Sequence, residues 1–155
     1  MQVFLEKKRH EAEEKKYKST VESKFALKGS KNGILFFPAW VGNNPYQKLL
    51  YEAINKKNDI SVSGHAKEAL CERFLKEKRN SYDYIHLHWL QAFIDFSDDA
   101  GADNLVSILT YAKSIGYKII YTAHNITSHD TEFAEREVVL RKKVAKLFDY
   151  ALVQW

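Results

Sequence analysis

Two short apolar stretches that end in histidines decide the fold: Tyr84-Ile85-His86-Leu87-His88-Trp89 and Ile119-Ile120-Tyr121-Thr122-Ala123-His124-Asn125. Short, nearly continuous apolar runs of this kind are typical of strands buried on both faces of a parallel sheet. Four of the six histidines lie in or just after these stretches. Because ligands of open α/β sheets bind beyond the carboxyl ends of the strands, we expect these titratable groups to border a ligand-binding crevice.

Strand-like and helix-like segments alternate from residue 33 onward. The predicted strands cover residues 33–37, 59–63, 84–88, 117–122 and 150–153, and the predicted helices cover residues 45–57, 66–79, 103–116 and 131–147. Such alternation with short connections predicts an α/β fold: a doubly wound, Rossmann-like parallel sheet of about five strands, with helices on both faces. The expected strand order is 2-1-3-4-5, with the second strand near an edge.

Local signals mark the helix ends and faces. Asn44 before Pro45 is typical of a helix start, and Gly116 is typical of a helix end. We expect Asp99 or Asp103 to cap the third helix. The face of the first helix that we expect to be buried consists of Tyr46, Leu49, Leu50, Ala53 and Ile54.

The size and composition indicate one domain, residues 32–155, behind a charged leader, residues 1–31. The single cysteine, Cys71, cannot form an internal disulfide, so we expect a reducing compartment and a packing role for the thiol. No stretch approaches the roughly 20 apolar residues of a membrane span, and the N-terminus lacks the apolar core of a signal peptide. A cytoplasmic protein is the expectation.

The leader carries the whole net charge of the chain. Residues 1–31 hold nine Lys or Arg and five Glu, and the chain has a net charge of +4. The neutral body lacks the broad basic face that binding to nucleic acid requires. The leader is therefore either a solvated helical or mobile extension, or a weak contact to an anionic membrane surface, which would be the inner membrane face.

The loop between the first strand and its helix is one candidate ligand contact. Gly42 permits close backbone approach, and with Asn43 and Asn44 it precedes a helix start whose free amides suit an anionic or polyhydroxylated ligand. The loop matches neither the Walker A pattern nor G-x-G-x-x-G. An ordinary connection explains the same residues.

The third strand carries two histidines on one face. His86 lies deeper in the strand and is interpreted as a hydrogen-bonded core residue. His88 lies at the strand end, where we expect solvent and ligand to reach it. Trp89 either forms a wall on which a sugar stacks or fills the end of the core.

The fourth strand ends in His124-Asn125, the strongest candidate pair. Imidazole can exchange a proton or bind a hydroxyl, and the Asn125 amide can orient the ligand. Asp130 could orient His129 or act as a base, whereas Asp130 or Thr131 could instead cap the next helix.

An ordered set of motifs resembles a known family. Phe37-Pro38-Ala39-Trp40, Asn44-Pro45-Tyr46-Gln47-Lys48-Leu49-Leu50, Ile85-His86-Leu87-His88-Trp89, Tyr121-Thr122-Ala123-His124-Asn125 with Ser128-His129, and Phe148-Asp149-Tyr150-Ala151-Leu152-Val153 follow one another along residues 33–155. Together they resemble the N-terminal half of bacterial GT-B glycosyltransferases of family 4, or group 1, which build exopolysaccharide and capsule.

The resemblance implies an enzyme that transfers a sugar from a nucleotide-sugar donor, a UDP- or GDP-sugar, to a glycan or lipid-linked acceptor. It implies that the N-terminal domain holds the acceptor and that His124 reaches toward the donor sugar. The loop from Gly42 to Asn44 then borders the acceptor and phosphate side, although the family's common Gly-Gly pair is Gly42-Asn43 here. The sequence lacks the family's donor-binding domain, so the expectation is a truncated enzyme or an acceptor-binding half that is inactive alone.

Two other interpretations stay open. His86 and His88 with His124, His129 and Asp130 could form the zinc or iron site of a hydrolase. Alternatively, the chain is a non-catalytic subunit that pairs with a separate donor-binding chain.

Overall fold

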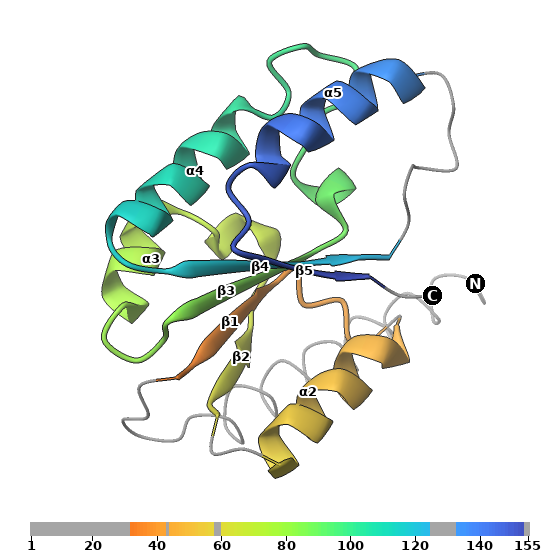
Figure 1. Ribbon diagram of the computed structural model, residues 1–155. Helices are drawn as coiled ribbons and strands as arrows, with labels where there is room; N and C mark the ends of the chain where they lie inside the picture. The colour runs from red at the N-terminus through yellow and green to blue at the C-terminus, as the bar shows by residue number, and fades with distance from the viewer. Residues whose placement is uncertain (1–31, 43, 58–59, 125–132, 154–155) are drawn as a thin grey trace, which may run out of the picture.

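The computed structural model of the chain describes residues 32–42, 44–57, 60–124 and 133–153 and confirms the predicted α/β fold (Figure 1). Within these residues, one parallel sheet has the order β2-β1-β3-β4-β5. Its strands are β1 (Ile34–Phe37), β2 (Val62–Gly64), β3 (Tyr84–His88), β4 (Lys118–Ala123) and β5 (Tyr150–Val153). The helices are α2 (Pro45–Lys57), α3 (Glu72–Lys78), α4 (Asp103–Ser114) and α5 (Ala134–Ala145), with two 3-10 turns, η1 (Lys67–Ala69) and η2 (Leu90–Ala92).

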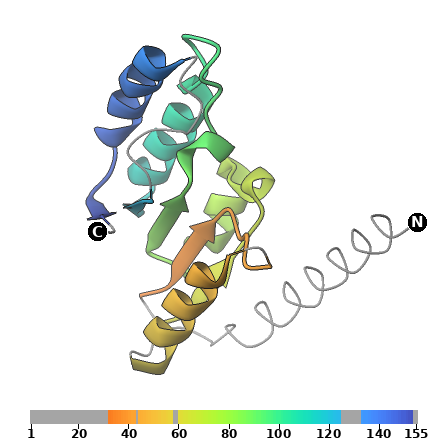
Figure 2. The ribbon, with the colours of Figure 1, turned by 90° about the vertical axis from the view of Figure 1, so that its right-hand side faces the viewer.

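Helices cover both faces of the sheet, as predicted. Helices α3, α4 and α5 lie on one face and α2 lies on the other (Figures 1 and 2). Because alternate residues of a strand point to opposite faces, Ile85 and Leu87 enter the larger core with α3 and α4, while His86 and His88 face α2. The three-helix face thus supplies most of the apolar core, and the α2 face holds both histidines of β3.

The single helix predicted for residues 66–79 is wrong. Turn η1 and helix α3 are separated at Leu70 and Cys71, and Cys71 has extended backbone (φ −143°, ψ 159°). Leu70 and Leu75 are both buried, but residues five apart on one continuous helix point in different directions. The break lets both leucines reach the core, and it leaves Cys71 exposed instead of packed.

The start of α2 confirms the predicted cap, whereas its buried face differs from the prediction. The Oδ1 atom of Asn44 accepts a hydrogen bond from the backbone N–H of Tyr46 at 2.9 Å. Leu49 is 64% exposed, and the helix instead buries Gln47 and Tyr51. The apolar pattern missed this face because its two central residues have polar tips that find partners inside the protein.

The predicted carboxylate cap of α4 is wrong. The N-cap residue is Ala102, which makes no side-chain cap hydrogen bond, and Asp103 is the first helical residue and pairs with Lys143. Gly116, at φ +99°, ends the helix region as predicted. Helix α5 has Phe133 at its N-cap position, so neither Asp130 nor Thr131 occupies that position.

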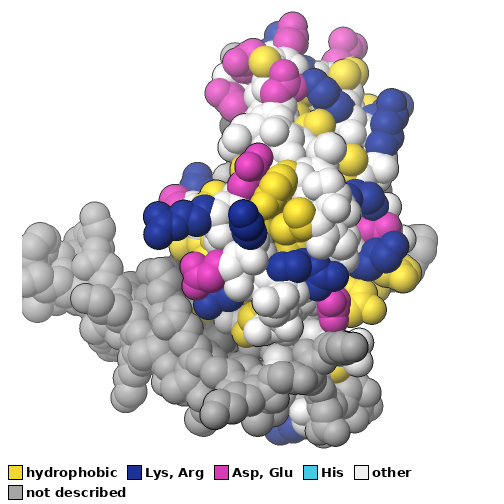
Figure 3. All heavy atoms as spheres, turned by 90° about the vertical axis from the view of Figure 1, so that its left-hand side faces the viewer, with side chains coloured by type: hydrophobic (Ala, Val, Ile, Leu, Met, Phe, Trp, Pro, Cys, Tyr) yellow, Lys and Arg dark blue, Asp and Glu magenta, His cyan; other side chains and the backbone are white. Residues whose placement is uncertain are grey.

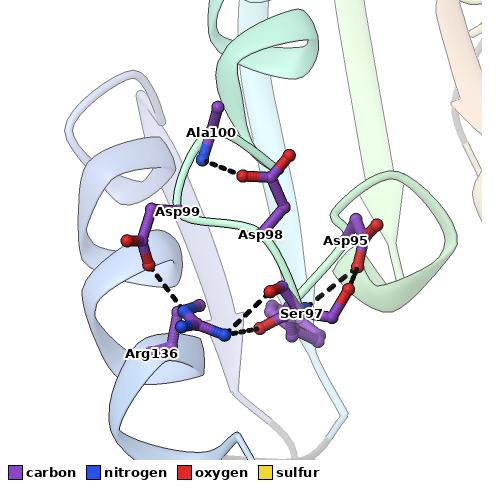
Figure 4. Close-up of polar contacts among 7 residues, drawn as sticks. Asp95, Ser97, Asp98, Asp99, Ala100 and Arg136 are labelled. Carbon is purple, nitrogen blue, oxygen red and sulfur yellow. Dashed lines mark hydrogen bonds and ion pairs between the residues drawn. The ribbon is translucent and has the colours of Figure 1, made fainter.

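Arg136 of α5 holds the loop that precedes α4 (Figure 4). Its Nε donates to Oδ1 of Asp99 at 2.6 Å, and its Nη1 donates to the carbonyl of Ser97 at 2.8 Å. Within the loop, Asp95 and Asp98 accept hydrogen bonds from backbone N–H groups two residues ahead. Asp99 is therefore a partner of α5 and not a cap of α4.

The surface on the side of α3 and α4 carries Lys or Arg and Asp or Glu side chains close together around a small apolar area (Figure 3). No helix in the described part of the chain has the length and apolar character needed to cross a membrane. The leader, residues 1–31, lies outside the described residues, so the expectation of a helical or mobile extension stays a prediction.

Two matched substitutions test which helix side chains are buried, one in α4 and one in α2. Leu109→Ala in α4 removes a fully buried side chain and is expected to lower the free energy of unfolding by about 2–5 kcal/mol. Leu49→Ala in α2 removes an exposed side chain and is expected to change the free energy of unfolding by less than about 0.5 kcal/mol. Urea unfolding followed by circular dichroism measures both, and a large loss for Leu49→Ala would contradict the observed face of α2.

Candidate functional site

Polar and aromatic side chains converge between α2 and the ends of β3 and β4. His86 and His88 come from β3, Thr122 comes from β4, and His124 follows β4 directly. Tyr51 enters from α2. Because β3 and β4 are parallel neighbours with His88 in register with Thr122, their histidines fall at the same edge of the sheet.

A continuous line of hydrogen bonds joins these five side chains, which we call the histidine relay. Thr122 Oγ1 lies 2.8 Å from His86 Nε2, and His86 Nδ1 lies 2.8 Å from the Tyr51 hydroxyl. The same hydroxyl lies 2.7 Å from His88 Nε2. His88 Nδ1 lies 3.0 Å from His124 Nε2.

Tyr51 is held at the junction of the relay by Phe36. Their rings stack with centroids 3.9 Å apart and planes 18° apart. Phe36 in turn fills the space next to Gly64 of β2, where a Cβ atom would overlap the Phe36 ring. The lack of a side chain at Gly64 therefore permits the ring stack that positions the tyrosine hydroxyl.

His88 is fully buried, so the expectation that solvent reaches it is wrong. The rings of Tyr46 and Tyr51 lie edge-on to His88, and the Trp89 ring lies 5.4 Å from it. His86 is buried and hydrogen-bonded, as predicted. Side chains at a strand end are not necessarily accessible, because the next residues can fold back over them.

Burial keeps the interior of the relay uncharged. Desolvation, with a smaller effect of His124, lowers the pKa of His86 to about 3. Desolvation, with smaller effects of His86 and His124, lowers the pKa of His88 to about 2. Burial, with a smaller effect of Tyr46, raises the pKa of Tyr51 well above its usual value. All three groups are therefore neutral at pH 7.

Trp89 has a strained backbone next to the relay. Its φ of 47° and ψ of 74° lie in the left-handed region, which costs a bulky residue about 1–3 kcal/mol. The Trp89 ring stacks on two others, on His124 at 4.5 Å and on Trp40 at 5.2 Å. Trp89 is partly buried, and the exposed ring of this group is Trp40, which is 40% exposed.

The loop that carries Trp40 is fixed by a buried glutamine. Gln47 Nε2 donates to the carbonyl of Pro38 at 2.8 Å, and its Oε1 accepts from the backbone N–H of Trp40 at 2.9 Å. A Cβ atom at Gly42 would meet no atom within 4 Å, so packing within the chain does not require a glycine there. Asn44 uses its carboxamide oxygen to cap α2.

The structure brings His88, Trp89 and His124 together, as the sequence predicts. Gly42 and Asn44 lie in the loop before α2, and four further predicted site residues, Asn43, Asn125, His129 and Asp130, lie outside the described residues. Sequence reasoning missed Tyr51, Gln47 and Thr122. Two signals could have found them: Gln47 and Tyr51 are four apart on one helix face, and Thr122 alternates with His124 along the fourth strand.

The described residues give no support to the metal-site alternative. Among them, no group of three or more His, Cys, Asp and Glu side chains could hold a metal ion. His86 and His88 each use both ring nitrogens in hydrogen bonds of the relay.

Comparisons of the chain with protein-family models, curated proteins and solved structures found no match. The fold defines the class as an α/β protein with a Rossmann-like parallel sheet. Its function has to be inferred from the site.

The buried histidines predict a loss of stability in acid. Their pKa values are lower in the folded chain than the ordinary 6.5, so this contribution is complete above pH 6.5 and decreases as the pH falls toward 3. Each histidine is expected to remove about 2 kcal/mol from the free energy of unfolding between pH 7.5 and pH 5. Urea unfolding at several pH values measures the combined loss of the free energy of unfolding from the two histidines.

Proton NMR provides the direct control. The ring signals of His86 and His88 should not titrate between pH 7.5 and pH 5 in the folded chain, whereas in urea they should titrate near pH 6.5. Titration of either signal near pH 6.5 in the folded chain would contradict a neutral relay.

Proposed function

We propose that the chain forms the acceptor side of a nucleotide-sugar-dependent glycosyltransferase. The enzyme transfers a sugar from a UDP- or GDP-sugar to a glycan or lipid-linked acceptor in the synthesis of a cell-surface polysaccharide. The donor serves as a co-substrate and not as a tightly bound cofactor. The proposal rests on the site geometry and on the resemblance of the ordered motifs.

The observation that carries the proposal is the half-buried His124 at the carboxyl edge of the sheet, stacked through Trp89 onto the exposed ring of Trp40. Sugars offer both hydroxyl groups, which hydrogen-bond to imidazole, and apolar C–H faces, which pack on aromatic rings. An edge of an α/β sheet that presents both kinds of group suits a carbohydrate ligand.

In the proposed reaction, an acceptor hydroxyl replaces the nucleoside diphosphate on the donor sugar. His124 contacts the sugar, Asn125 orients it, and the loop from Gly42 to Asn44 borders the acceptor. Asp130, with His129, is the candidate base. The donor-binding domain lies outside the described residues, either on the same polypeptide or on a partner chain.

A lipid-linked acceptor would bring the chain to the inner membrane face. The leader holds nine basic residues and five glutamates. A basic residue near an anionic surface contributes about 1 kcal/mol of attraction. Peripheral contact through the leader is therefore part of the proposal.

Substitution of the exposed tryptophan tests carbohydrate binding. Trp40→Ala is expected to weaken binding of acceptor-type oligosaccharides by about threefold to tenfold, since it removes one aromatic stacking surface. Binding is measured with the purified chain by ligand-observed NMR across an oligosaccharide panel.

The matched control is Tyr150→Ala, which removes another exposed aromatic side chain at the amino end of β5, away from the histidines. It should leave binding unchanged. Equal binding by the wild-type chain and Trp40→Ala would contradict the proposed sugar surface.

Activity assays test the need for a second domain. The purified chain with UDP-glucose or GDP-mannose and a lipid-linked acceptor is expected to transfer little or no sugar, because most of the donor contacts are proposed to lie elsewhere. Adding a donor-binding chain encoded nearby should restore transfer, and His124→Ala should abolish the restored activity. Transfer by the purified chain alone would overturn the requirement for a donor-binding partner.

A further inference from the structure

We propose that the histidine relay runs in one hydrogen-bond direction, from Thr122 to His124, and thereby fixes neutral His124 as the tautomer protonated on Nδ1. Tyr51 and His88 are then positioning residues that act through His124. The inference rests on the proposed function only for the role of His124 toward a sugar.

The number of hydrogens allows three arrangements of the relay. A neutral imidazole has one N–H group and one nitrogen lone pair, and the Tyr51 hydroxyl has one hydrogen. Each of the four links needs one hydrogen between its two heavy atoms. Each neutral ring donates once and accepts once, but the Tyr51 oxygen can accept from both rings. All links therefore point the same way, in one of two directions, or both rings donate to Tyr51, whose own hydrogen then has no acceptor among the described residues.

In the first direction, every donor has an acceptor. The Thr122 hydroxyl donates to His86 Nε2, and His86 Nδ1–H donates to the Tyr51 hydroxyl oxygen. The Tyr51 hydroxyl then donates to His88 Nε2, and His88 Nδ1–H donates to His124 Nε2.

The second direction leaves one buried hydrogen unpaired. In it, His86 Nε2–H donates to Thr122, whose own hydroxyl hydrogen then needs another acceptor. Thr122 is fully buried, and among the described residues its hydroxyl has the single partner His86. An unpaired buried hydroxyl hydrogen, on Thr122 in this arrangement or on Tyr51 when both rings donate to it, disfavours either alternative by roughly tenfold to a hundredfold in population. The first direction therefore prevails.

The chosen direction decides the chemistry of His124. Its Nε2 accepts from His88, so the neutral ring carries its proton on Nδ1 and is a hydrogen-bond donor there. Adding a proton at Nε2 would require both links of His88 to reverse, which would leave the Tyr51 hydroxyl hydrogen without an acceptor among the described residues. In the proposed function, the neutral His124 ring therefore acts as a hydrogen-bond donor at Nδ1 and does not act as a base at that atom.

Nitrogen NMR of the full chain without ligand tests the assignment. In a ¹⁵N-labelled sample at pH 7.5, long-range ¹H–¹⁵N correlations distinguish protonated from unprotonated ring nitrogens. His86, His88 and His124 are expected to show a protonated Nδ1 and an unprotonated Nε2. A protonated Nε2 on His124 in the wild-type chain would overturn the proposal.

Two variants test transmission along the relay. Tyr51→Phe removes the central hydroxyl but keeps the ring that stacks on Phe36, and Thr122→Val removes the first donor with little change in shape. Both are expected to shift His124 from the single Nδ1–H form to a mixture with Nε2–H. An unchanged His124 tautomer in a folded variant would overturn the proposal.

The matched control is Tyr117→Phe. Tyr117 is as deeply buried as Tyr51, and its hydroxyl donates to the carbonyl of Leu75 at 2.9 Å on the opposite face of the sheet. Its loss should destabilise the fold without changing the His124 tautomer. If Tyr51→Phe does not fold, the wild-type spectrum and Thr122→Val still decide the question.

The readouts separate this inference from the proposed function. The tautomer is measured without sugar, whereas the proposed function is tested by oligosaccharide binding and transfer. A single Nδ1–H form with no sugar binding would support the relay and contradict the function. Sugar binding with an Nε2–H form would support the function and contradict the relay.

Discussion

The two hydrogen bonds at the Tyr51 hydroxyl are the interaction on which the α2 face of the sheet depends. Two histidines of β3 point at a helix that would otherwise cover apolar side chains, and neither could be buried there without partners. The Tyr51 hydroxyl forms a hydrogen bond with each of the two imidazole rings. Within the described residues, no buried side-chain nitrogen or oxygen lacks a partner, so this polar layer is compatible with the core around it.

Much of the fold followed from the sequence because its signals are local. The apolar runs of β1, β3 and β5, the Asn44-Pro45 start and the glycine after α4 gave the strand order and most helix bounds. The break before α3 and the exposed Leu49 could not be predicted, because both are decided by which side chains reach the core in three dimensions.

The candidate site was predictable only in part, for a related reason. Alternation along β3 and β4 placed His86, His88 and His124 on one face, but strand spacing does not specify what the opposing helix offers them. Apolar periodicity did not identify Tyr51 as a site residue, because its ring packs in the core while its hydroxyl belongs to the site. His88 is buried among the rings of Tyr46, Tyr51 and Trp89, an enclosure that the strand pattern does not specify.

Gly64 has no functional group and lies on an edge strand, yet it limits how the site can vary. A methyl group there would displace the Phe36 ring on which Tyr51 rests, and the hydroxyl between the two histidines would move with it. The tolerance of this site to mutation is thus set partly at a residue that contacts none of its polar groups. In a selection for function, position 64 should be as restricted as the histidines themselves.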